Sequence, residues 1–172
     1  PKETETVPAG LDWDLWLGPA PERPFNHVYL PFVWRGWADF GCGALGDMGS
    51  YSFDTIFRVL KLDAPVSVEC SSTDRYAETY PQASIVRYTF PARGNMPPVK
   101  FNWYDGGLKP ARPDELEDGR PLKGDGEEDE GLLFVGDTGK ILCSFNGGNP
   151  KLIPQSKMDA FQPPPKTLPR SP

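Results

Sequence analysis

The pattern of hydrophobic and polar positions predicts one long helix near the middle of this chain. From residue 44 to residue 61, apolar side chains recur three or four positions apart, which is the spacing of one face of an α-helix. The residues on this face are Leu45, Met48, Ser52, Ile56 and Val59 or Leu60, with Phe53 and Phe57 widening it. A glycine-containing turn at 41–43 precedes the helix, and Pro65 follows soon after its end. We therefore expect an amphipathic helix with one buried face.

Beyond residue 65 the pattern changes to the alternation that is typical of β-strands. The predicted strands are residues 66–70, 83–90, 99–104, 132–136 and 140–145. The Asp-Thr-Gly turn at 137–139 predicts a hairpin between the last two of them. A long helix followed by about five strands predicts an α+β fold, in which a largely antiparallel open sheet carries the helix on one face.

The remaining segments predict little regular structure. Residues 11–18 suit one or two helical turns, with Asp12 as the N-cap. Residues 19–40 are rich in proline and aromatic side chains without a period, which indicates a substrate-lining loop or a docking surface. The acidic run at 124–131 is typical of a solvated loop. We expect a linker at 1–10, one folded domain at 11–160 and an extended proline-rich tail at 161–172.

The composition of the chain argues against several classes of binding partner. The net charge of −6 comes without a basic patch, so we expect no nucleic-acid partner. No apolar run approaches the roughly 18 residues of a membrane span, so we expect no membrane partner. Three widely spaced cysteines and one histidine, His27, fit neither a disulfide framework nor a metal site. We expect buried free thiols, and a surface or packing role for His27.

The polar side of the predicted helix carries the candidate chemistry. Asp47, Tyr51, Asp54 and Arg58 follow each other at spacings of four, three and four, so they share one side of the helix. An exposed polar stripe would have the same pattern. Just upstream, aromatic side chains and a cation could complete a site for a sugar, whose hydroxyls suit carboxylates and whose C–H surfaces suit aromatic faces. These upstream residues are Trp34, Arg35 and Trp37.

Three blocks of sequence, in order, resemble the bacterial Gfo/Idh/MocA oxidoreductases. They are residues 11–21, residues 34–37 and residues 41–49. The likeness continues through Asp54 into residues 65–68, and it covers most of residues 8–110. The resemblance implies the C-terminal domain of such an enzyme, with a fold like that of the dihydrodipicolinate reductase C-terminal domain.

The resemblance also implies an activity and roles for residues. In this family a separate Rossmann domain binds NAD or NADP, so this chain alone is expected to bind no cofactor and to be inactive. Asp47 and Asp54 match the family's aspartates, and Tyr51 stands where most members have histidine. The implied catalytic residues are Tyr51 and Asp47. The implied substrate is a sugar or polyol, contacted by the substrate-binding residues Asp54, Arg35, Trp34 and Trp37.

Two other interpretations stay open at this point. The chain could belong to an NAD-dependent glycosidase of the same family, or it could be a non-catalytic structural or interaction module that acts through its sheet. In all three cases we expect a homodimer through the sheet. Phe101 and Trp103 share one face of their predicted strand, and that face would be an exposed apolar patch in a monomer.

Overall fold

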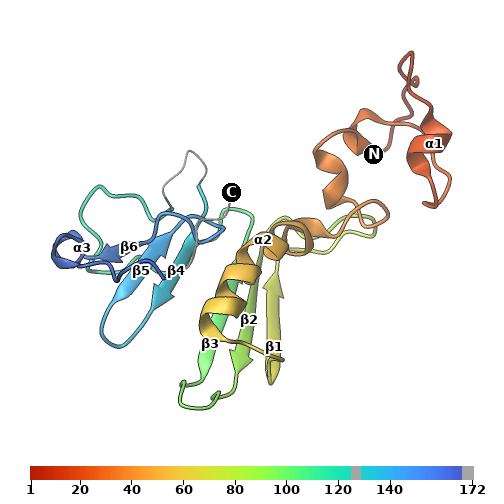
Figure 1. The fold of residues 1–172 in the computed structure, drawn as a ribbon. Coiled ribbons are helices and arrows are strands. Elements are labelled where there is room, and N and C mark those ends of the chain that lie inside the picture. Colours follow the sequence, from red (N-terminus) through yellow and green to blue (C-terminus); the bar gives the residue numbers. More distant parts are fainter. Residues whose placement is uncertain (125–128, 168–172) are drawn as a thin grey trace. The chain divides into compact units, whose positions relative to one another are not determined.

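The computed structural model describes residues 1–124 and 129–167 of the chain (Figure 1). Contacts divide the chain into two compact units, residues 1–110 and 111–172. Each unit contains a three-stranded antiparallel sheet, so the α+β class is confirmed, but the strands form two small sheets where the sequence predicted one. The predicted acidic loop lies partly outside the described residues, as does the end of the predicted tail.

The first unit is organised around the helix α2, Gly43–Leu60, which lies across the sheet of β1, Ser67–Ser72, β2, Ser84–Phe90, and β3, Val99–Tyr104 (Figure 1). The strands pair in the order β1-β2-β3. Lys61 ends the helix in a left-handed conformation, and its backbone N–H donates to the carbonyl of Phe57. This is a common way to satisfy the last free carbonyls of a helix.

Aromatic side chains join α2 to its sheet. The Phe53 ring lies 4.6 Å from that of Phe101 and 5.9 Å from that of Trp103, and Phe57 lies 5.6 Å from the buried Phe90. The prediction that Phe101 and Trp103 leave an exposed apolar patch is therefore wrong, because that face of the sheet is the one α2 covers. By strand alternation the opposite face carries polar residues such as Arg87.

Residues 11–40 form an aromatic segment with little regular structure. It contains the helix α1, Trp13–Leu17, and two short 3₁₀ helices, His27–Tyr29 and Val33–Gly36. The predicted N-cap is confirmed, since the Asp12 carboxylate accepts from the backbone N–H of Leu15. Within the segment, Trp13 contacts Phe25 and Tyr29, both of which are buried. The aromatic segment is thus a packed part of the unit.

The second unit has its own core. The strands β4, Leu132–Val135, β5, Lys140–Cys143, and β6, Lys151–Ile153, are followed by α3, Gln155–Ala160. The predicted hairpin is confirmed by the antiparallel pairing of β4 with β5, whereas β6 and α3 were not predicted. The core consists of Leu116, Leu142 and Ile153, with Leu122 and Leu133 packed against it.

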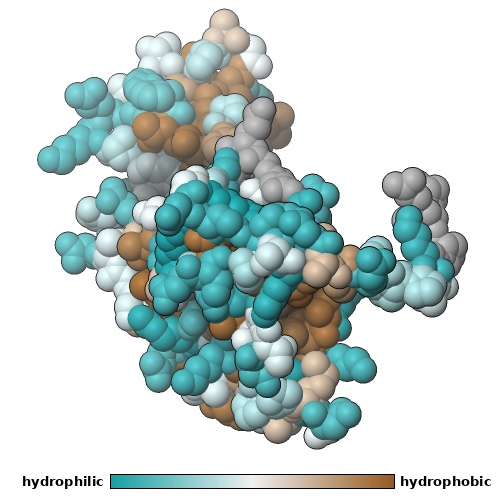
Figure 2. Space-filling view, turned by 90° about the vertical axis from the view of Figure 1, so that its left-hand side faces the viewer, coloured by the Kyte–Doolittle hydropathy of each residue, from teal (hydrophilic) through white to brown (hydrophobic). Residues whose placement is uncertain are grey.

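The surface of the protein carries cysteines as well as large hydrophobic side chains. The three cysteines are free, but only Cys143 is buried, while Cys42 and Cys70 are exposed. Large hydrophobic side chains also reach the surface, and Figure 2 shows brown patches among the hydrophilic areas. Among the described helices, none has the length and apolar character needed to span a membrane.

Candidate functional site

The turn that leads into α2 brings the predicted site residues together. It follows the 3₁₀ helix that carries Trp34 and Arg35. At Gly41 a β-carbon would lie only 2.4 Å from the backbone Cα of Arg35. Only glycine therefore allows the chain to fold back so closely before α2 begins. This close approach places the 3₁₀ helix beside the first turns of α2.

An ion pair joins the two elements. Arg35 Nε lies 2.5 Å from Asp47 Oδ2, and the two side chains are 32% and 29% exposed. Arg35 Nη1 also donates to the backbone carbonyl of Phe32. The guanidinium lies 4.5 Å from the centre of the Phe32 ring and 5.2 Å from that of Trp34. The structure thus brings three predicted site residues, Trp34, Arg35 and Asp47, into one cluster.

The other two predicted residues of α2 lie further along the helix. Tyr51 follows Asp47 by one helical turn and is 56% exposed. Asp54 accepts from Arg58 Nε at 2.8 Å, and both side chains are mostly exposed. The polar side of α2 therefore changes from a half-buried ion pair near its start to an exposed one near its end.

Trp37 lies within the aromatic segment. Its indole Nε1 donates to the carbonyl of Val28 at 3.0 Å, and its ring meets that of Tyr29 edge-on at 4.7 Å. The polar edge of the indole is thereby engaged inside the protein. This residue was predicted to contact substrate, and the structure gives it a packing contact and a hydrogen bond within its own segment.

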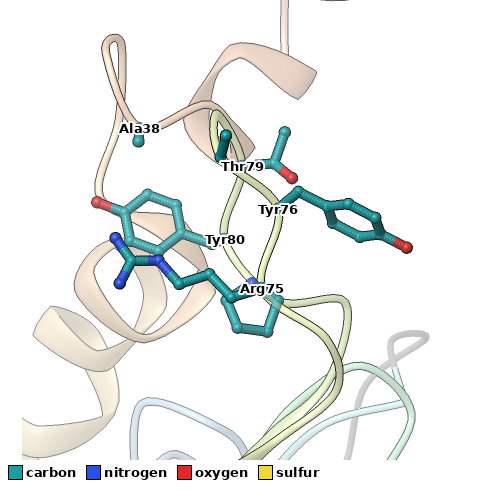
Figure 3. Close-up of a pocket in the computed structure, with 7 residues that line it drawn as sticks. Ala38, Arg75, Tyr76, Thr79 and Tyr80 are labelled. Carbon is teal, nitrogen blue, oxygen red and sulfur yellow. The ribbon is translucent and has the colours of Figure 1, made fainter.

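Two cavities lie near the turn. One, of about 310 Å³, is lined by Trp16, Leu17, Pro19, Ala20, Trp34, Asp39 and Phe40. The other, of about 280 Å³, is lined by Ala38, Arg75, Tyr76, Ala77, Thr79, Tyr80 and Pro81 (Figure 3). Asp47, Tyr51 and Asp54 are in neither lining. Trp34 alone among the predicted site residues borders one of them.

The lining of the second cavity was missed from the sequence. It belongs to the connection between β1 and β2, which docks on the end of the aromatic segment. The backbone N–H of Tyr80 donates to Gly36, and that of Ala38 donates to Glu78. The Tyr80 ring packs against Gly43 at the start of α2. These residues belong to no motif that indicates a site. The sequence shows only two tyrosines and an arginine between two strands.

The comparisons with known proteins bear on the first unit. The model of the Gfo/Idh/MocA oxidoreductase family, C-terminal alpha/beta domain, matches residues 2–95, which is more than half of the chain. The chain belongs to this family. No curated protein matches it. The aromatic segment, the turn, α2, β1 and β2 all fall inside the matched range, so the Arg35–Asp47 cluster is part of the Gfo/Idh/MocA domain.

A second cation of this Gfo/Idh/MocA domain was also missed from the sequence. Arg23 pairs with Asp39 and lies 5.2 Å from the centre of the Phe40 ring, with little exposure. Burial alone would lower the pKa of Arg23. A hydrogen bond to Tyr29 and the charges of Asp39 and Glu78 offset this, so its pKa is raised. Arg23 remains a fixed positive charge beside the cavity that Asp39 and Phe40 line.

The described residues of this Gfo/Idh/MocA domain carry neither a cluster of metal-ligating side chains nor a dinucleotide fingerprint. In the described part of the chain no group of three or more His, Cys, Asp or Glu side chains is arranged to hold a metal. The sequence has no glycine-rich dinucleotide fingerprint between a strand and a helix.

Proposed function

We propose that this chain is the substrate-binding and dimerisation domain of an NAD(P)-dependent oxidoreductase that acts on a sugar or polyol. Membership of the Gfo/Idh/MocA family supports an oxidoreductase as the class of enzyme. The observation that carries the site is the Arg35–Asp47 ion pair, which lies beside Trp34 and one turn before Tyr51. The chain works together with a Rossmann domain of the natural protein, which holds the cofactor.

In this proposal each side chain has a simple role. Oxidation of an alcohol removes a hydride and a proton. A nicotinamide, when bound, would supply the hydride acceptor, and a side chain of this domain would accept the proton. Tyr51, as its phenolate, takes the proton on its oxygen, and Asp47 accepts a hydrogen bond from a substrate hydroxyl. A phenol has an ordinary pKa of about 10, so a tyrosine in this role needs a cation nearby. That cation would come from the Rossmann domain.

Two further side chains complete the proposed substrate surface. Trp34 borders a cavity and offers an aromatic face to the C–H surface of a sugar. Asp54 lies two turns after Asp47 and serves a more distant hydroxyl. Its ion pair with Arg58 is exposed, and such a pair exchanges for another partner at little cost. Trp37 and Arg35 act on the site indirectly, because their polar groups are engaged inside the protein.

The proposed dimer must form through a different surface from the one that the sequence predicted. Phe101 and Trp103 contact Phe53 of α2. A candidate surface is the edge strand β1, whose six residues are all exposed. We propose that a second copy pairs along this free edge, since an edge strand presents unpaired backbone donors and acceptors. Light scattering at rising concentration tests this, and a monomer throughout would contradict it.

One alternative has an observation in its favour. Tyr51 is largely exposed, and neither cavity near the turn includes Asp47 or Tyr51 in its lining. This arrangement also suits a non-catalytic module that acts through its surface. Such a module would lose nothing in function when the phenol is removed, which separates the two proposals.

The test uses the natural protein that contains this chain, assayed for nicotinamide reduction with a panel of sugars and polyols. Tyr51→Phe should lower the rate of hydride transfer about 100-fold or more, because it removes the proton acceptor. Tyr104→Phe is the control, since Tyr104 lies on β3 and lines neither cavity. It should stay within about twofold of the wild type. Equal rates for wild type and Tyr51→Phe would remove Tyr51 from the mechanism.

A further inference from the structure

We propose that Arg35 is a positioning residue: it holds Asp47 in place and fixes the turn before α2 to the helix, and it does not itself bind substrate. This inference rests on the proposed function of Asp47. It changes the role that the sequence indicated for Arg35, which was direct contact with substrate. The guanidinium makes several contacts of different kinds inside the protein.

The Arg35 side chain is engaged on several sides. Its Nε is paired with Asp47, its Nη1 donates to the carbonyl of Phe32, and its planar group faces two aromatic rings. A guanidinium offers its donors in a rigid fork, so two fixed acceptors and a stacked face leave it few other orientations. An anionic group of a ligand would have to displace Asp47 to reach the Nε donor.

The backbone around Arg35 is equally constrained. Phe32 adopts φ +78°, which is unfavourable for a bulky side chain and persists only where the surroundings stabilise it. Its carbonyl is the one that accepts from Arg35. On the other side, Gly41 lies against the Arg35 backbone, and the Gly41 N–H donates to the carbonyl of Trp37 at 2.9 Å. Arg35 therefore links a strained backbone position, the turn and α2.

The effect on Asp47 follows from its surroundings. An aspartate on an exposed helix surface samples several rotamers, whereas one that is half-buried against a fixed guanidinium keeps one orientation. A hydrogen-bond acceptor for a substrate hydroxyl must be held in place to be effective. The Asp54–Arg58 pair on the same helix lacks this support, because both of its partners are mostly exposed and come from neighbouring turns.

The first measurement is a double-mutant cycle on unfolding of the 172-residue chain. Arg35→Ala, Asp47→Ala and the double variant should show a coupling of about fivefold in the unfolding equilibrium constant. The control cycle uses Arg58→Ala and Asp54→Ala, where the coupling should be about twofold or less. A coupling of Arg35 to Asp47 no larger than that of the control cycle would overturn the proposal, whatever the activity of the protein.

The second measurement separates positioning from substrate binding in the natural protein. Arg35→Ala should lower kcat about tenfold and leave KM within about twofold, because Asp47 is still present but no longer fixed. Arg35→Lys should recover part of kcat, since its ammonium can pair with Asp47 but cannot hold the Phe32 carbonyl in the same fork. Arg58→Ala should change neither constant by more than about twofold.

The outcomes distinguish this inference from the proposed function. A large rise in KM with unchanged kcat for Arg35→Ala would make Arg35 a substrate ligand and overturn the positioning role. If the natural protein oxidises no sugar or polyol, the proposed function fails and with it the catalytic purpose of Asp47. The stability cycle still decides in that case whether Arg35 fixes Asp47.

Discussion

The aromatic segment of residues 11–40 and the strand β1 belong to the same unit but differ in packing. The segment with the less regular backbone is the one that buries side chains. The aromatic segment is mostly irregular, but it buries Leu17, Phe25 and Tyr29. The strand β1 is regular and fully paired with β2, but all its residues are exposed. In this unit, burial therefore follows side-chain contacts and not the regularity of the backbone hydrogen bonds.

The hydrogen bonds of the aromatic segment support the same conclusion. The indole of Trp13 donates to the carbonyl of Arg23, and the indole of Trp37 donates to that of Val28. In an irregular segment such bonds replace the ladder that a helix or strand would supply. The segment can thus keep Trp34 and Arg35 in a fixed place at its end, which is what the proposed site at the start of α2 requires.

The largest effect is expected in the interior of the aromatic segment. Phe25→Ala should lower the free energy of unfolding by about 3–5 kcal/mol, because Phe25 is 3% exposed and its removal leaves a cavity beside Trp13. Leu15→Ala, in the neighbouring helix α1 but 78% exposed, should cost about 0.5 kcal/mol or less. Denaturant unfolding of both variants checks this. Equal losses would mean that the aromatic segment is not packed as described.

An intermediate effect is expected at Trp37. Trp37→Phe keeps an aromatic ring against Tyr29 but removes the donor to the Val28 carbonyl, so it should cost about 1–2 kcal/mol. Denaturant unfolding measures this cost. The variant of the natural protein should lose activity only to the extent that it unfolds. At a temperature where it is folded, its KM for substrate should equal that of the wild type. A selective rise in KM would instead place Trp37 in contact with substrate.

The sequence predicted those parts of this unit that depend on local pattern. Phe53 and Phe57 recur at helical spacing, and this marked the apolar face of α2. Asp12 before an apolar run marked the start of α1. The same kind of signal, a three-residue turn between two apolar runs, identified the hairpin of β4 and β5 in the second unit.

What the sequence did not predict depends on contacts between distant residues. Alternation showed that Phe101 and Trp103 share a face, but it could not show that α2 covers that face. Arg35 and Asp47 were both candidates, but their pairing depends on a turn that brings the two elements together. The sequence also did not predict the division into two sheets. Local pattern identifies strands, but it does not show whether β3 pairs with a strand on the far side of residues 105–131.

The smallest effect is expected where residues 1–10 meet the aromatic segment. The Glu5 carboxylate accepts from the backbone N–H of His27 at 3.0 Å and lies 2.7 Å from its ring Nδ1. First the backbone bond and then the side-chain bond lower the pKa of Glu5 below its ordinary value of 4.5. Because the folded-state pKa is depressed, the stabilising contribution is present above pH 4.5 and is lost as the pH falls through the folded-state pKa.

Unfolding of the wild type and Glu5→Gln over this acidic range measures the effect. The wild type should lose stability relative to the variant as the pH falls below 4.5, and the two should converge once Glu5 is protonated. Parallel curves at all pH values would mean that Glu5 does not stabilise this contact. A difference between the two curves that shrinks as the pH falls would show that the Glu5–His27 contact fixes residues 1–10 to the aromatic segment. These residues contain no helix or strand.

We propose that the polar side of α2 faces the substrate. A crystal structure of the natural protein with reduced nicotinamide cofactor and a polyol bound tests this. We expect substrate hydroxyls within hydrogen-bond distance of Asp47 and the Tyr51 phenol, with the Arg35–Asp47 pair intact and Trp34 against the carbon chain. A polyol bound elsewhere, with Tyr51 still in solvent, would contradict it.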